Sequence, residues 1–117
     1  MQVDVTAERV GRNQSTFRDA NEKIEIRATE LFGESAVSVP FICECPDPTC
    51  TAVTTLSLVE YEMVRSRGEW FLAVPGHEVC VVDGEQVAKV ERRCETFSLM
   101  EKIGSAREVA RELDPRE

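Results

Sequence analysis

The sequence predicts an α+β fold with a long N-terminal amphipathic helix, a small, mostly antiparallel sheet that carries a cysteine-rich clip, and a short C-terminal helix. Three observations lead to this expectation: apolar residues at heptad spacing near the start, short β-branched and aromatic runs between turn residues, and Ser-x-x-Glu sequences that begin helices. With 117 residues, 42% of them hydrophobic and 31% charged, the chain fits a single domain, 1–117.

Residues 7–32 give the strongest helix signal in the chain. Apolar side chains recur along one face of this segment, at Val10, Phe17, Ile24 and Leu31. Gly33 is expected to end the helix. At ~1.5 Å per residue the helix is ~39 Å long, which exceeds the width of a domain of this size. We therefore expect the apolar face to pack on the domain's own sheet, with a partner protein or a second copy of this chain as the alternative.

Residues 36–102 are expected to form a β-rich core. Runs of β-branched and aromatic residues predict strands at 36–45, 53–56 and 70–74. Pro40 marks the first of them as an edge strand. The turn sequence Asp83-Gly84 predicts a hairpin, and the apolar residues of 87–102 supply one or two further strands with a turn near Glu95.

Two capping boxes predict the remaining helices. Ser57 and Glu60 begin a helix at 58–66, inside the β-rich core. Ser105 and Glu108 have the same spacing and predict the C-terminal helix at 104–113.

The charge balance limits the partners. Twenty-two acidic and 14 basic residues give a formal charge of −8, and no undiluted basic cluster stands out, so direct nucleic-acid binding is not expected. No apolar run is long enough for a signal peptide or a membrane span. We therefore expect a cytoplasmic protein without membrane contact. Because thiols stay reduced there, the five cysteines indicate metal binding rather than disulfides.

Cys43, Cys45, Cys50 and His77 are the candidate metal ligands. Cys43 and Cys45 are two residues apart, so both thiols lie on the same face of an extended chain. The turn Pro-Asp-Pro-Thr brings Cys50 back beside them. His77, the only histidine, follows the turn Pro75-Gly76 at a strand end. Three thiolates and an imidazole are a donor set for structural Zn²⁺, which is the cofactor we expect.

Several alternatives remain open at this stage. Cys80 is the competing fourth ligand, and Cys94 is expected to be a plain core thiol. The cysteines of the cluster would be ordinary buried residues if no metal binds. A catalytic zinc would need an open position beside Glu44, Asp47 or Glu78, but three thiolates make the ion a poor Lewis acid. We therefore assign no catalytic residue.

Three segments together resemble a known family. They are FICECPDPTC (41–50), LSLVEYEMVR (56–65) and FLAVPGHE (71–78), and the segment RNQSTFRDANEKI (12–24) fits the leading helix of the same family. The pattern is similar to that of small, uncharacterised bacterial proteins typical of actinobacteria, with Phe-x-Cys-Glu-Cys-x-Asp-x-x-Cys, then Glu-Tyr-x-x-Val-Arg, then Pro-Gly-His-Glu. The resemblance implies that the four ligands belong to one site and carries no activity with it.

Three functions follow as hypotheses from different classes. The first is a small zinc-stabilised protein-interaction module with a regulatory role, which contacts another protein through the helix at 7–32. The second is a thiol and zinc redox-responsive regulator of transcription that acts as anti-sigma factors do. The third is a small zinc hydrolase.

Overall fold

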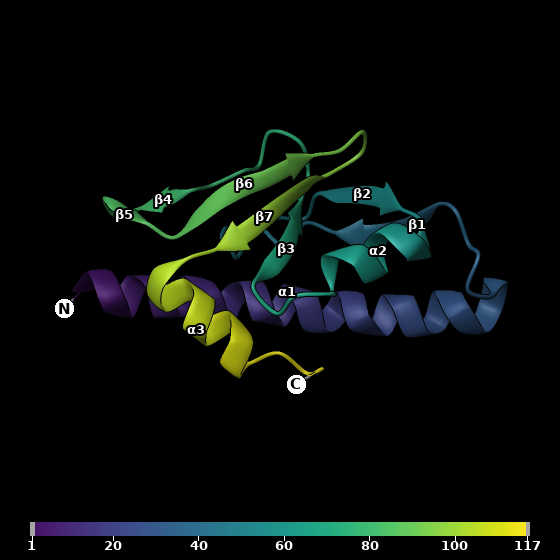
Figure 1. The fold of residues 1–117 in the computed structure, drawn as a ribbon, viewed down its shortest axis with the longest axis horizontal. Coiled ribbons are helices and arrows are strands. Elements are labelled where there is room, and N and C mark those ends of the chain that lie inside the picture. The colour runs from purple at the N-terminus through teal and green to yellow at the C-terminus, as the bar shows by residue number, and fades with distance from the viewer. Residues whose placement is uncertain (1, 117) are drawn as a thin grey trace.

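A long helix runs the full length of the molecule. The computed structural model describes residues 2–116, with side chains from residue 11 onward, and its dimensions are 46 × 28 × 23 Å. Helix α1 (Gln2–Phe32) lies along the longest axis, beneath the strands (Figure 1). It ends at Gly33, whose φ of +81° suits glycine and whose amide donates to the Thr29 carbonyl oxygen at 2.9 Å. The helix predicted at 7–32 is thus confirmed, with an earlier start.

The strands form small antiparallel sheets on one side of α1. Strands β1 (Val39–Ile42) and β2 (Val53–Leu56) pair with each other. Strands β3 (Trp70–Ala73), β7 (Ser98–Lys102) and β6 (Ala88–Arg93) form a second sheet in that order. Strands β4 (Val81–Val82) and β5 (Glu85–Gln86) form a hairpin whose turn residues, Asp83 and Gly84, have φ of 51° and 80°. The predicted α+β class is confirmed.

Two short helices complete the fold. Helix α2 (Leu58–Val64) begins with the predicted capping box, in which the Ser57 hydroxyl accepts from the Glu60 amide and the Glu60 carboxylate accepts from the Ser57 amide. Helix α3 (Gly104–Glu112) packs against α1. The second predicted capping box is wrong: the helix is capped at Ile103 without a side-chain bond, because Ser105 instead donates to Glu85 of β5.

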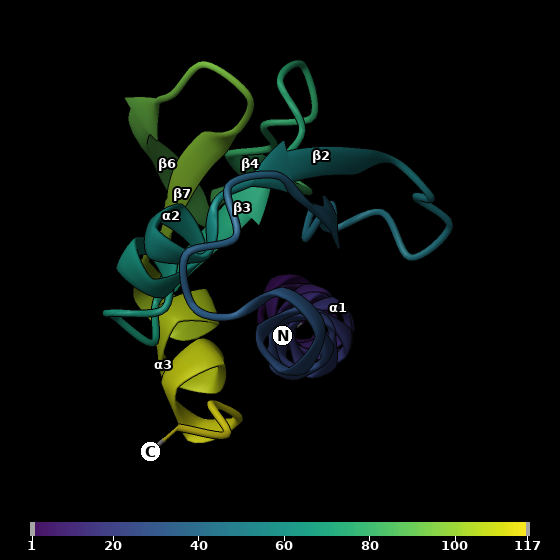
Figure 2. The same cartoon turned by 90° about the vertical axis from the view of Figure 1, so that its right-hand side faces the viewer.

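The face of α1 that docks onto the domain is polar. In Figure 2, which looks along α1, the strands lie on one side of the helix and α3 beside it. Of the expected apolar stripe, Phe17 and Ile24 are only half-buried, Leu31 is 55% exposed, and the side chain of Val10 lies outside the described residues. The described residues that α1 buries are instead mostly polar, namely Gln14, Ser15, Arg18 and Asn21, and the others are Gly11 and Ala28. The docking face is therefore rotated relative to the predicted one.

Most of the buried apolar residues of the described chain form two clusters. The first surrounds the stacked rings of Phe41 and Tyr61, whose centroids are 4.3 Å apart. The second contains Cys43 and Cys45 together with residues of β3, β6, β7 and α3. The cysteine-rich loop is thus part of the core. Among the described residues, no helix is long and apolar enough to cross a membrane.

Candidate metal centre

The structure brings Cys43, Cys45, Cys50 and His77 together. Their four potential ligand atoms all lie within 4.8 Å of one another. The Nδ1 atom of His77 is 3.5 Å from the Cys50 Sγ and 3.9 Å from the Cys43 Sγ. Cys43 and Cys45 are buried, whereas Cys50 and His77 are half-buried at the edge. This group of side chains could hold one metal ion.

The chain continues from β1 as an extended loop that presents two of the thiols. The Cys43 amide donates to the Ala52 carbonyl oxygen at 3.0 Å, which prolongs the pairing with β2. The next amide, that of Glu44, donates at 3.0 Å to the carbonyl oxygen of Leu72 in β3. Since side chains alternate along an extended chain, Cys43 and Cys45 share one face and Glu44 points to the other. The expected same-face arrangement therefore follows from backbone pairing on both sides of the loop.

Two turns deliver the other donors. Asp47 accepts from the Thr49 amide through its side chain and from the Cys50 amide through its carbonyl oxygen, at 2.9 and 3.1 Å, which closes the turn before Cys50. The His77 amide donates to the Val74 carbonyl oxygen at 2.8 Å across a turn in which Gly76 has φ of +94°. The imidazole thus comes from just beyond the end of β3, as predicted.

Burial disfavours the thiolate form of the two buried cysteines. Burial raises the pKa of Cys43 to about 12, although the Val74 amide donates to its sulfur at 3.3 Å. Burial also raises the pKa of Cys45. Because a metal binds thiolates, the ion must displace the thiol protons, and its binding is therefore coupled to pH.

The neighbouring carboxylates are each engaged with protein groups. Glu44 is 1% exposed and accepts from the Leu72 amide and from Asn21. Asp47 accepts from Thr49, and Glu78 accepts from the Ser98 hydroxyl and pairs with Arg93. They are therefore poorly placed to serve as a free general base.

Cys80 and Cys94 lie outside the four-residue group. Cys80 is half-buried and packs against the second apolar cluster, while its carbonyl oxygen accepts from the amides of Val87 and Ala88. These backbone bonds hold it within the strand region, so the four-residue group contains His77 and not Cys80. Cys94 packs, partly buried, against the first cluster, as expected for a core thiol.

Buried charged side chains near the centre, among them Arg18, Glu44 and Lys102, have no signature in the sequence. Burial raises the pKa of Glu44 to about 6 and lowers the pKa of Lys102 to about 7. The side chains of Arg18 and Lys102 both lie over the Phe71 ring, 4.4 and 5.1 Å from its centroid. The sequence offers one signal of a polar docking face, because Asn13 and Asn21 lie close to the apolar stripe of the helix segment.

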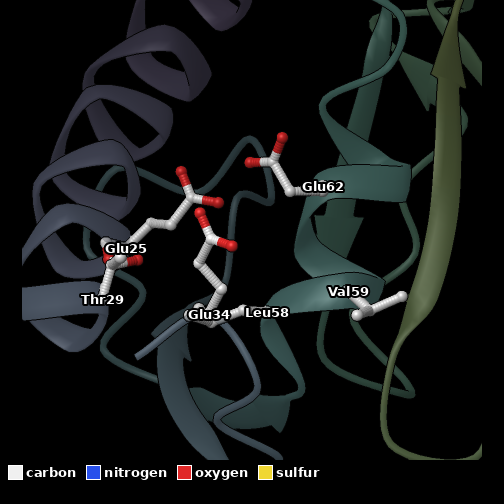
Figure 3. Close-up of a pocket in the computed structure, with 6 residues that line it drawn as sticks. All are labelled: Glu25, Thr29, Glu34, Leu58, Val59 and Glu62. Atoms are coloured by element: carbon white, nitrogen blue, oxygen red, sulfur yellow. The ribbon is translucent and has the colours of Figure 1, made fainter. Parts of the chain in front are cut away.

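A separate pocket of about 530 Å³ opens between α1 and α2. It is lined by Glu25, Thr29, Glu34, Leu58, Val59 and Glu62. Figure 3 shows the carboxylates of its three glutamates turned toward one another. Burial and the Glu62 carboxylate raise the pKa of Glu25 to about 8. The hydrogen bonds from Arg116 and Glu25 lower the pKa of Glu62 to about 2.

No protein-family model matches this chain, and no curated protein and no solved structure matches it. The fold and the Cys₃His group define a small α+β protein with a candidate metal centre. Family membership stays a prediction from the motifs.

Proposed function

We propose that Cys43, Cys45, Cys50 and His77 bind one structural Zn²⁺ ion. The proposal depends on the convergence of the four donor atoms within 4.8 Å. A tetrahedral zinc ion with sulfur and nitrogen ligands at ~2.3 and ~2.0 Å separates a thiolate sulfur from an imidazole nitrogen by roughly 3.6 Å. The separations of 3.5 and 3.9 Å from the His77 nitrogen fit this geometry. Four protein ligands close the coordination shell, which favours a structural role.

Metal analysis of the purified chain tests this assignment. We expect one zinc per chain, bound in the cytoplasm where thiols are reduced. Cys45→Ser should lose the metal. Cys80→Ser is the matched control and should keep it, because Cys80 lies outside the group. A wild-type chain without stoichiometric metal, or a Cys80→Ser chain that loses its zinc, would contradict the assignment.

We further propose that this zinc-stabilised domain is a regulatory protein-interaction module. The proposal is supported by the surface at the C-terminal end of α1, beside the acidic pocket. Large apolar residues are exposed there, namely Ile26, Phe32 and Val59, at 60%, 70% and 73%. Three glutamates line the adjacent pocket. A segment of another protein that carries arginine beside apolar side chains matches this surface in charge and polarity.

The chain itself illustrates the chemistry of this surface. Arg116 donates to Glu22, Glu25 and Glu62 at 2.6–3.1 Å. Burial and the neighbouring Glu62 carboxylate raise the pKa of Glu25, so a further cation beside it would favour its ionised form. An incoming guanidinium would therefore be attracted electrostatically.

Affinity capture from the native cell tests the interaction. The intact chain should retain a basic partner that a Val59→Asp, Glu34→Lys variant loses while still binding zinc. Unchanged capture by this variant would contradict the proposed surface. Size-exclusion chromatography of the pure chain distinguishes the homodimer, which would elute at twice the monomer mass.

The position of Cys80 favours a second candidate, a redox-responsive regulator of transcription similar in action to anti-sigma factors. This half-buried thiol packs against the same cluster as Cys43 and Cys45. Peroxide would oxidise two thiolates to a disulfide, release Zn²⁺ and be reduced to water. Peroxide treatment should then release zinc and partner together, and partner binding that persists after zinc loss would exclude this role.

A zinc hydrolase is the least favoured candidate, because the four protein ligands fill the shell and the nearby carboxylates are engaged. We also propose, on the motif pattern alone, that the chain belongs to the family of small actinobacterial-type proteins that it resembles.

A further inference from the structure

We propose that Asn21 and Gln14 are positioning residues for the metal centre, so that metal binding and the docking of α1 stabilise each other. The inference rests on the proposed metal site and adds a means of regulation to it. The two residues lie on the buried polar face of α1, and neither belongs to the ligand set.

Asn21 binds the backbone of the ligand loop, the segment 42–45 that carries Cys43 and Cys45, as a neighbouring strand would. Its Nδ2 donates to the Ile42 carbonyl oxygen at 2.8 Å, and its Oδ1 accepts from the Ile42 amide at 2.9 Å. Both peptide groups of the residue before Cys43 are thereby held by one side chain. Asn21 is fully buried, so these bonds are made where water does not compete.

Glu44 connects the same helix to the residue between two ligands. Its Oε2 accepts from the Asn21 Nδ2 at 2.8 Å, and its carbonyl oxygen accepts from the Gln14 Nε2 at 2.9 Å. Its Oε1 accepts from the Leu72 amide at 3.0 Å. The loop is therefore fixed by α1 and β3 on the face opposite the thiols of Cys43 and Cys45.

These contacts make the two events interdependent. The helix buries Gln14, Ser15, Arg18 and Asn21 at this point, and the hydrogen bonds of Gln14 and Asn21 require acceptors that the loop holds in place. A metal ion cross-links the loop to Cys50 and His77 and so restricts the positions of Ile42 and Glu44. By thermodynamic linkage, the free energy by which metal binding stabilises helix docking equals the free energy by which docking strengthens metal binding. Loss of the metal should thus let residues 14–21 open more often.

Hydrogen exchange of the full chain tests the coupling from the metal side. We expect the amides of residues 14–21 to exchange about tenfold faster after chelation of zinc than in the loaded chain, while β7 stays protected. Equal exchange of residues 14–21 in the two states would overturn the proposal. Loss of protection throughout β7 would also overturn it, because the metal would then hold the whole fold rather than the helix.

Zinc affinity, measured by competition with a chromophoric chelator, tests the same coupling through substitutions in the helix. Asn21→Ala should weaken zinc binding about tenfold or more, as the loss of groups that orient ligands does elsewhere. Gln14→Ala, which removes a single hydrogen bond and is less disruptive, should weaken it in the same direction by less. Lys23→Ala, an exposed position on the same helix, is the matched control and should bind as the wild type does.

The outcomes separate this proposal from the metal assignment. Wild-type affinity in Asn21→Ala, or equal weakening in Lys23→Ala, would overturn the positioning role while the metal site stands. A wild-type chain that binds no zinc would instead refute the metal centre itself.

Discussion

Replacement of Arg18 by methionine should test the polar docking of α1 most directly. The Arg18 side chain is fully buried, and its guanidinium donates to the carbonyl oxygens of Gly68 and Ala110 at 2.6 and 2.7 Å. Ala110 lies in the last turn of α3, where carbonyl oxygens lack helical partners and the helix dipole favours a cation. Arg18 thus joins α1 to the end of α3 and to the chain before β3.

The expected loss follows from the groups left behind. Each buried carbonyl oxygen without a donor costs about 1–3 kcal/mol, so the two together cost about 2–6 kcal/mol. Methionine fills much of the same volume and removes a cation whose burial lowers its pKa, which offsets part of this loss. We expect Arg18→Met to lower the free energy of unfolding by about 2–4 kcal/mol.

Urea denaturation at saturating zinc, followed by far-ultraviolet circular dichroism, measures this change. Arg27→Met on the same helix is the control, because that side chain is 70% exposed and its loss should change stability by less than ~0.5 kcal/mol. The stability of Arg18→Lys should fall between those of Arg18→Met and Arg27→Met, since a lysine ammonium lacks the forked guanidinium that reaches both carbonyl oxygens. If Arg18→Met were as stable as Arg27→Met, the polar docking of α1 would be energetically unimportant.

Three further predictions follow. Chelation of zinc should lower the free energy of unfolding by about 2.7 kcal/mol relative to a solution in which free zinc is a hundredfold above its Kd, and readdition of zinc should reverse the change. Glu25 has a pKa raised from 4.5 to about 8, so its contribution to stability is present below pH 4.5 and is lost as the pH rises through 8. Glu25→Gln should therefore flatten the decline in urea midpoint over that range, and an unchanged pH profile would refute the like-charge contact with Glu62. In Gly11→Ala, the added Cβ would lie 2.8 Å from the Cγ1 of Val109, so the melting temperature should fall; Gly11→Ala, Val109→Ala should recover part of it.

Features encoded within a few residues could be predicted from the sequence. The Ser57 box, the stop at Gly33 and the Asp83-Gly84 turn each depend on local backbone preferences, and each has the expected form. The Ser105 box has an equally good pattern and failed, because a side chain from a distant strand, Glu85, binds the serine. Local patterns are therefore reliable only where tertiary partners do not compete.

The grouping of the four candidate ligands could be predicted because metal chemistry restricts the combinations, whereas the docking face of α1 could not. Three thiols within eight residues and a single histidine leave few tetrahedral combinations, and the turn before His77 indicated its position. By contrast, Arg18 and Asn21 look like solvent-facing residues in sequence. Their burial depends on backbone carbonyl oxygens of Gly68, Ala110 and Ile42, whose positions only the folded chain defines.

The separation of the core into two apolar clusters explains how a metal centre could regulate this domain without being required for its folding. The first apolar cluster, around Phe41 and Tyr61, contains none of the four ligands. The second cluster includes Cys43 and Cys45 and is built mostly from small residues, such as Ala73 and Ala88, which bury little apolar surface each. The metal should therefore matter most where apolar packing is weakest. Because the ligand loop is also bonded to the polar face of α1, loss of the ion should loosen this loop and the adjoining helix while β7 and the first cluster persist.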